Sequence, residues 1–442
     1  ESTPYGILSL GIKPWSKNIL REEKCFYSAS GVPVYLYGNP ALHGFYISLF
    51  LREGSMYEAA EESGITHFFE HIAIRNLNKT LGGELYRRLD RLGLELNAST
   101  YCEMVQFYVS GAAENFYAGA QLLTSVLSPI VLSPSEITLE RKRIKAEIRE
   151  GDERTSLTAF TNSHLFGSTA LSRPITGTLG SVSKIGKREL TAFRERALTS
   201  ENLFFYVTGN AGERETEKLI ECIDGINIPR GAGRDNFAPV TPDFSKRGGG
   251  VYMKNADFTM CRFSFDTDMT LLSVPELDLL YDLLLNGYNS RLFIALSEER
   301  GLFYDVNGLA ERYRNIGHFS FSFEVKDKEL YDACETVVSI LRDIKERTVA
   351  PEEIIRAGYV TNSGMLYDDM RELNFTFAYD NHILGLGYGS IGERAEMYSS
   401  ITPERLREAA RRLFTEDNLT LTLKADTKRV DAERLKKIIS AL

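Results

Sequence analysis

The sequence has few cysteines, no excess of positive charge and no long apolar run, and each lack excludes a class of protein. The five cysteines are scattered and never spaced Cys-x-x-Cys, which argues against a disulfide framework and a cysteine-rich metal site. Lys and Arg total 52 against 61 Asp and Glu, and this net charge of −9 is unfavourable for binding nucleic acid. No apolar run approaches the roughly 20 residues of a membrane-spanning helix. We therefore expect a globular protein without a membrane span or a nucleic-acid partner.

The sequence predicts the cellular location only coarsely. Scattered thiols favour a reducing compartment, so the cytoplasm is the expected location. The chain begins at Glu1 without a Met, as it would after removal of a leader or after trimming of the sequence. A periplasmic or secreted protein therefore stays open as an alternative.

Histidine is also scarce, yet two of the six histidines fall in one short stretch. Residues 64–71 read GITHFFEH, and helical spacing places His67, Glu70 and His71 on one face. Two imidazoles and a carboxylate are what a catalytic Zn²⁺ takes from one helix, with a third ligand from elsewhere and an open position for water. The order is that of the inverted zincin signature. The alternative is that the two are surface histidines that happen to lie four residues apart. We interpret the remaining four, His43, His164, His318 and His382, as structural or surface residues.

Strand-like and helix-like stretches alternate through the first half of the chain. A Ser-Pro-Ser-Glu sequence predicts a helix start, with Ser133 as the cap, Pro134 at the first position and Glu136 completing a capping box. Residue patterns predict further helices over residues 82–92 and 116–127 and on both sides of a strand at 203–207, and other strands over residues 32–37, 45–51, 94–100 and 104–110.

The third metal ligand is not fixed by residue type and spacing. Glu140 and Glu147 lie two turns apart on the helix that Pro134 begins, so they share a face. Either carboxylate could complete the site. The alternative for either residue is a solvated ion pair, because the helix is rich in Lys and Arg.

An internal repeat divides the chain, whose 442 residues already suggest two domains. Residues 185–202 align without gaps with residues 401–418, and residues 133–137 align with 350–354 at nearly the same offset. This agreement predicts two tandem copies of one α+β domain, in residues 1–226 and 249–442. A Gly- and Pro-rich stretch over residues 227–248 is the predicted linker.

The second copy lacks the proposed metal-binding residues. At the offset of the repeat, the positions of His67, Glu70, His71, Glu140 and Glu147 fall near Leu284, Gly287, Tyr288, Ala357 and Gly364. Residues that served folding alone would not be expected to disappear as a set. The repeat therefore strengthens the metal interpretation.

The stretch from His67 to His71, followed by Glu147, resembles the pitrilysin/insulinase family of zinc metallopeptidases (inverzincins). The similarity is to the half-size bacterial and mitochondrial-processing-peptidase-like branch, and it covers nearly the whole chain. The helix at Pro134, the linker and residues 290–304 all have family counterparts. The resemblance implies two homologous α/β-sandwich domains, each an antiparallel-rich sheet covered by helices. It also implies a zinc endopeptidase with one Zn²⁺ per chain.

The resemblance implies a role for each site residue. His67, His71 and Glu147 are expected to bind zinc, and Glu70 to act as the general base on the zinc-bound water and then pass the proton to the leaving amine. Glu140 is expected behind the ligands, where it orients them. A further stretch resembles the edge strand to which the substrate adds as an extra strand, namely Asn97, Ala98, Ser99 and Thr100.

The sequence departs from the family at one catalytic position. The family uses an Arg and a Tyr in a stretch like Leu-Arg-Glu-x-x-Gly-Leu-x-Tyr; here Tyr304 is present as a catalytic candidate, but Ser297 replaces the Arg. In the half-size branch this pair acts across a dimer, so a homodimer of this chain would lack the cation that stabilises the developing oxyanion. We therefore expect a heterodimer with a homologous sister chain that supplies Arg and Tyr, in preference to a homodimer. Arg300, one turn away, is an alternative source of the charge.

The expected function is hydrolysis of short or unfolded peptides inside a chamber that two chains close. The alternative from another class is a non-catalytic core or docking subunit of a larger complex, since the family contains such proteins. The intact general base Glu70 argues against this alternative. A zinc amidohydrolase is disfavoured because its ligands would include more Asp and His at strand ends.

Overall fold

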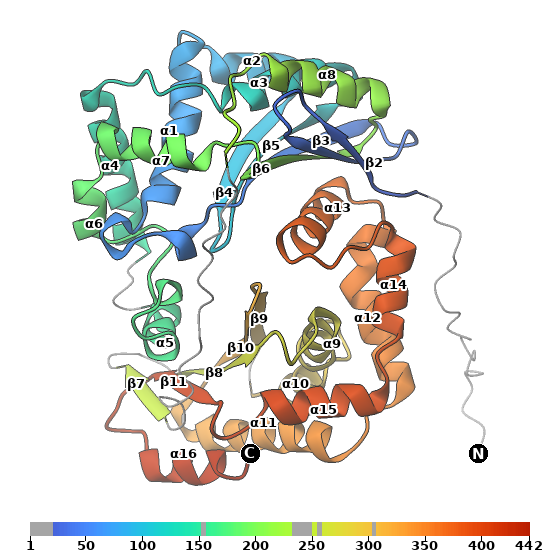
Figure 1. Ribbon diagram of the computed structural model, residues 1–442. Coiled ribbons are helices and arrows are strands. Elements are labelled where there is room, and N and C mark those ends of the chain that lie inside the picture. The colour runs from blue at the N-terminus through green and yellow to red at the C-terminus, as the bar shows by residue number, and fades with distance from the viewer. Residues whose placement is uncertain (1–20, 152–155, 232–249, 254–258, 303–305) are drawn as a thin grey trace.

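The computed structural model describes residues 21–151, 156–231, 250–253, 259–302 and 306–442. These form two halves, each a sheet with helices against it, that face each other across the middle of the molecule (Figure 1). Most of the predicted linker over residues 227–248 lies outside the described residues. Among the helices that are described, none has both the length and the apolar character needed to cross a membrane.

The first half is built on a six-stranded sheet. Its strands are β1 (Lys24–Tyr27), β2 (Pro33–Gly38), β3 (Gly44–Leu51), β4 (Glu95–Thr100), β5 (Val105–Ala112) and β6 (Leu203–Gly209). They lie in the order β1-β2-β6-β3-β5-β4, and only the pair β2–β6 is parallel. The central strands β3 and β6 are almost wholly buried, in keeping with their continuous apolar sequences. β4 lies at one edge of the sheet.

The helices of the first half mostly cover one face of this sheet (Figure 1). They are α1 (Ile65–Thr80), α2 (Leu85–Leu92), α3 (Phe116–Ser125), α4 (Pro134–Glu150), α5 (Leu157–Leu165), α6 (Leu179–Lys184), α7 (Lys187–Ala197) and α8 (Glu213–Asp224). Short 3₁₀ turns are η1 (Ser55–Tyr57), η2 (Ala60–Glu62), η3 (Ala113–Asn115) and η4 (Ala170–Ser172).

Two helix starts test the sequence predictions. The capping box before α4 is confirmed, because Ser133 Oγ accepts from the Glu136 N–H at 3.3 Å and Glu136 Oε2 accepts from the Ser133 N–H at 2.9 Å. The helix predicted over residues 82–92 is shorter than expected and begins at Leu85. Gly82 and Gly83 precede it with φ of 66° and 88°, a left-handed backbone that cannot continue a right-handed helix.

The second half contains a five-stranded sheet with its own helices. The strands are β7 (Gly250–Met253), β8 (Thr259–Asp268), β9 (Val306–Arg312), β10 (Ile316–Val325) and β11 (Thr420–Lys424). The helices are α9 (Val274–Leu284), α10 (Arg291–Phe293), α11 (Leu330–Glu346), α12 (Pro351–Leu366), α13 (Met370–Phe377), α14 (Ile391–Ser399), α15 (Pro403–Leu413) and α16 (Ala432–Ile439). Short π-helical segments are η6 (Ile294–Glu298) and η8 (Ala378–Ile383), and a short 3₁₀ turn is η7 (Asp327–Glu329).

The second sheet repeats the strand order of the first, as the internal repeat predicts. Its order is β7-β11-β8-β10-β9, which corresponds strand by strand to β2-β6-β3-β5-β4. The parallel pair β7–β11 takes the place of the parallel pair β2–β6. The predicted α+β fold with a tandem duplication is therefore confirmed.

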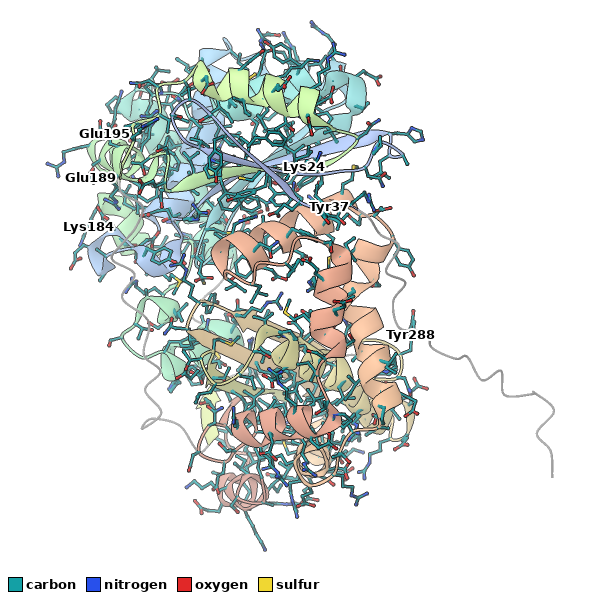
Figure 2. The ribbon with its side chains drawn as sticks, turned by 45° about the vertical axis from the view of Figure 1, so that its right-hand side comes forward. Lys24, Tyr37, Lys184, Glu189, Glu195 and Tyr288 are labelled. Carbon is teal, nitrogen blue, oxygen red and sulfur yellow. The ribbon has the colours of Figure 1, made fainter. Side chains whose placement is uncertain are left out.

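One part of the predicted alignment between the copies is wrong. α9 packs on α12, α15 and β9, as α1 packs on α4, α7 and β4, so α9 is the counterpart of α1. α9 ends at Leu284, and both Gly287 and Tyr288 lie beyond it. Tyr288 is 95% exposed and lies at the outer surface (Figure 2). The sequence of α9, VPELDLLYDLL, contains no histidine, so the absence of the histidine pair from the second copy still holds.

Each half contributes one helix that packs on the inner face of the sheet in the other half. α5 of the first half packs on β11, where Thr161 Oγ1 and Thr422 Oγ1 are 2.6 Å apart. α13 of the second half packs on β3 and β6, and Asn374 Nδ2 donates to the carbonyl of Tyr206 at 2.9 Å. Tyr37, on β2, lies above α13 in Figure 2 with its ring centroid 4.7 Å from that of Phe377. Each inner face is therefore covered partly by the other copy.

Candidate metal centre and active site

α1 holds the His-x-x-Glu-His stretch in place through its apolar side. Ile65, Phe68 and Ile72 are fully buried in the core of the first half. Their helical spacing puts them on one stripe, and His67 and His71 flank this stripe on the side that meets α4. The apolar stripe of α1 is used for packing in the core, so His67 and His71 beside it are available to bind a metal.

His67, His71 and Glu147 lie together, with one ligand atom from each within 4.8 Å of the others. Glu147 Oε1 is 3.5 Å from His67 Nε2, and Glu147 Oε2 is 3.6 Å from His71 Nε2. Tetrahedral zinc ligands at about 2.0–2.1 Å from the ion lie about 3.4 Å from one another, so these separations suit Zn²⁺. Within the described residues no other group of His, Cys, Asp and Glu meets this criterion.

Glu140 lies behind His71, away from the candidate metal position. Its Oε1 is 3.1 Å from His71 Nδ1, and its Oε2 accepts from Arg75 Nη1 at 3.1 Å and from Arg143 Nη1 at 3.3 Å. Burial alone would raise the pKa of Glu140, but His71 and the two arginines hold that pKa below its ordinary value. An ionised Glu140 favours a proton on Nδ1 of His71, which leaves the Nε2 lone pair for a metal.

The pKa values of the two histidines are shifted in opposite directions. Burial lowers the pKa of His67 to about 4, with the nearby His71 adding to the effect, so His67 is neutral at pH 7 and ready to bind a metal. Burial also acts to lower the pKa of His71, but the hydrogen bond to Glu140 and the charges of Glu70 and Glu140 outweigh it and raise that pKa. His67 Nδ1 is buried and has no hydrogen-bond partner among the described residues.

Glu70 lies between the histidines and the edge strand. Its Oε2 accepts from Thr100 Oγ1, on β4, at 2.5 Å. Burial raises the pKa of Glu70, although the hydrogen bond from Thr100 and the charge of His71 act against this. A carboxylate with a raised pKa is a better proton acceptor, as a general base needs to be.

The predicted substrate stretch Asn97 to Thr100 belongs to β4, which among the described residues pairs with β5 alone. Its even-numbered residues face α1, as the contact of Thr100 with Glu70 indicates. The amide of Ala98 donates to Asn97 Oδ1 at 2.9 Å. The structure therefore brings a free sheet edge next to Glu70.

The predicted Arg and Tyr positions lie in the second half of the chain. Tyr304 falls outside the described residues. Ser297 belongs to the π-helical segment η6. Arg300, the alternative cation, donates from Nη1 to Asp332 Oδ1 at 2.6 Å in a partly exposed ion pair. Its charge is already paired within this half.

Three contacts of the site were not predicted from the sequence. Arg75 lies one turn beyond His71, and this helical spacing could have pointed to its contact with Glu140. The contact of Thr100 with Glu70 joins two elements and has no signal in the sequence. The contact of Glu58 with the N-terminal turn of α1 also has no signal in the sequence, because Glu58 lies outside that helix.

Comparisons with known proteins agree with this arrangement. A family model described as Insulinase (Peptidase family M16) matches residues 35–179, and one described as Peptidase M16 inactive domain matches residues 184–357. An uncharacterized zinc protease of Rickettsia felis is 25% identical over 403 residues, which are 87% of this chain and 93% of that protein. The mitochondrial-processing peptidase subunit beta of Blastocladiella emersonii is 27% identical over 218 residues, 49% of this chain and 46% of that protein.

Solved structures share the fold along most of the chain. A protease from Helicobacter pylori superposes with a TM-score of 0.79 at 16% identity, covering 92% of this chain and 100% of that one. A chain of complex III2 from Candida albicans superposes with a TM-score of 0.76 at 15% identity, covering 94% and 99%. Two successive family matches, a zinc-protease relative of matching length and a shared fold lead to one conclusion: the chain belongs to the insulinase family of peptidases, family M16.

Proposed function

We propose that this chain is a zinc-dependent endopeptidase. The observation that supports it best is the cluster of His67, His71 and Glu147 with Glu70 and an open sheet edge beside it. The two histidines and Glu147 would hold one Zn²⁺. Bound zinc supplies a Lewis acid that polarises a peptide carbonyl and lowers the pKa of water.

Glu70 is proposed to move the protons of the reaction. It takes a proton from the attacking water and passes it to the leaving amine, so one carboxyl serves as base and then as acid. Burial supports this role because it raises the pKa of Glu70 toward the operating pH. The hydroxyl of Thr100 holds Oε2, which leaves Oε1 to meet the water.

The substrate is proposed to be a short or unfolded peptide that adds to β4 as an extra strand. Backbone hydrogen bonds of this kind do not depend on side chains, so we expect broad or shape-based selectivity. The amide of Ala98 would exchange its bond to Asn97 for one to the substrate backbone. Glu140 would keep His71 oriented throughout.

The active unit is proposed to be a heterodimer whose two chains close a chamber. Ser297 lacks a positive charge and Arg300 is paired with Asp332, so this chain offers no free cation at either predicted position. A homologous sister chain would supply an Arg and a Tyr to the zinc site. The name of the Blastocladiella relative, a subunit, agrees with a multi-chain enzyme.

The test compares wild-type protein with Glu70→Gln, alone and mixed with a sister chain, for zinc content and cleavage of a fluorogenic peptide. We expect E70Q to bind zinc normally and to lose about 10²–10⁴-fold in kcat, the contribution of a general acid–base group. Full activity of E70Q would contradict the mechanism, and full activity of the wild-type chain alone would contradict the heterodimer. A zinc-loaded chain that cleaves nothing with any partner would indicate a docking subunit.

A further inference from the structure

The segment between β3 and α1 is tied to the end of the edge strand. The Ser55 N–H donates to the carbonyl of Tyr101 at 3.2 Å, and the Met56 N–H donates to that of Cys102 at 2.9 Å. Both carbonyls follow directly after β4. The turn η1 is therefore fixed to the strand on which the substrate is proposed to lie.

Glu58 joins this segment to the first turn of α1. Its Oε2 accepts from the Gly64 N–H at 2.7 Å and its Oε1 accepts from the Thr66 N–H at 2.9 Å. Gly64, the N-cap, has no side chain to satisfy these donors, which a helix start normally leaves open. Glu58 is 7% exposed, so its carboxylate serves as a buried cap from outside the helix.

The other side of this helix start is packed against a loop. A Cβ placed on Gly64 would lie 2.6 Å from the carbonyl oxygen of Thr176 and 2.8 Å from Cα of Gly177. Arg173, from the same loop, donates through Nη2 to the backbone carbonyl of Glu58 at 2.6 Å. The first turn of α1 is thus held between Glu58 and this loop, with no room to shift toward the loop.

The fold does not gain stability from the charge of Glu58. Burial raises the pKa of Glu58 to about 7, even though the N–H groups of Gly64 and Thr66 act to lower it. When a carboxyl has a higher pKa in the folded state than in the unfolded state, the folded state loses stability as the pH rises from the unfolded-state pKa to the folded-state pKa. A Gln at this position would avoid this cost, but its amide NH2 cannot accept from an N–H, so one of the two hydrogen bonds to the helix start would be lost.

We propose that Glu58 is a positioning residue that fixes α1, and with it His67 and Glu70, relative to β4. The inference rests on the proposed function, since it concerns the same site. Thr66, whose N–H Glu58 binds, directly precedes His67. Loosening this turn shifts a metal ligand and the base against the substrate strand without removing either.

The experiment compares Glu58→Gln with the matched control Glu276→Gln. Glu276 caps α9, the counterpart of α1; it accepts from the Ser273 N–H at 2.7 Å and is also 7% exposed. We measure the Tm, the zinc affinity by chelator competition, and kcat and KM of the zinc-loaded enzyme with its partner. For E58Q we expect a loss of about tenfold or more in zinc affinity and in kcat, with KM and Tm little changed. For E276Q we expect zinc affinity and kcat to be unchanged.

The inference is overturned if E58Q matches wild type or E276Q in both zinc affinity and kcat. If E58Q does not fold, the same measurements on Arg173→Lys decide, because this change loosens the hold on Glu58 while leaving its carboxylate in place. We expect R173K to lower kcat and zinc affinity in the same sense, and no effect would overturn the inference. Wild-type protein that neither binds zinc nor cleaves peptide would instead refute the proposed function itself.

Discussion

At the scale of single residues, the two glutamates of α4 occupy different environments on one helix face. The side chain of Glu147 is 47% exposed and faces both histidines, whereas that of Glu140 is 5% exposed and lies between His71 and two arginines. A ligand needs an accessible lone pair, while a group that orients a ligand needs fixed partners. The environments therefore match the two roles proposed for them.

This difference predicts unequal losses of zinc affinity. Glu147→Ala removes one of the three proposed protein ligands, and we expect stoichiometric zinc binding to be lost. Glu140→Gln keeps the ligands but weakens the orientation of His71, so a loss of about 10–100-fold is expected. Chelator competition measures both. The exposed Glu150, on the same helix, provides the control E150Q, and equal effects of E140Q and E147A would contradict the assignment.

Among the secondary-structure elements, β4 is an edge strand that, within the described part of the chain, pairs with β5 alone. Edge strands carry unpaired backbone groups, which proteins usually cover or blunt. The amide of Ala98 is satisfied by the neighbouring side chain of Asn97, at 2.9 Å. A side-chain partner of this kind can be displaced by a peptide backbone at little cost.

Removal of the Ala98 N–H tests strand addition. Proline is tolerated on edge strands where the N–H faces outward, so Ala98→Pro is expected to fold. Since the substrate loses one backbone donor, we expect KM to rise about tenfold with zinc content unchanged. Asn97→Ala, which frees the Ala98 N–H without removing it, is the comparison variant, and we expect its KM to stay below that of A98P. An unchanged KM in A98P would contradict binding along this edge.

At the scale of the whole molecule, the halves are interlocked by the exchange of α5 and α13. Asn374, on α13, is fully buried and donates to the carbonyl of Tyr206 in the sheet of the first half. An apolar cluster surrounds this contact and draws on both halves, including Phe50, Phe204 and Phe377. Neither sheet can expose its inner face without losing contacts of the other half, so we expect cooperative unfolding.

Asn374→Ala tests this coupling between the halves. It leaves a buried carbonyl with one donor fewer, and we expect a loss of about 1–3 kcal/mol in the free energy of unfolding. Calorimetry and denaturant titration should show one transition for both halves, shifted as a whole. The control is Asn418→Ala, because Asn418 donates to the Asp266 and Leu413 carbonyls within the second half. Two separate transitions in the wild-type protein would contradict the interlocked fold.

Features that depend on neighbours along the chain could be predicted from the amino-acid sequence. The spacing of His67, Glu70 and His71 depends on α1 alone. The cap at Ser133 and the face shared by the two glutamates depend on α4 alone. The repeat predicted the duplicated fold because two copies of one pattern fold alike. The alignment failed around α9, where the connection that follows β8 is shorter than the one that follows β3.

The contacts between separate elements could not be predicted in this way and follow from the packing of the folded chain. Residue patterns made Glu140 and Glu147 equally good candidates for the third metal ligand. The packing of α4 against α1 places Glu147 next to both histidines and Glu140 behind His71. Glu58 shows the same limit, because its partners lie on a helix start whose position depends on a distant loop at Gly177. The physical reason is that helical period fixes the direction of a side chain on its own element. The groups that lie opposite it are set by packing between elements far apart in the sequence.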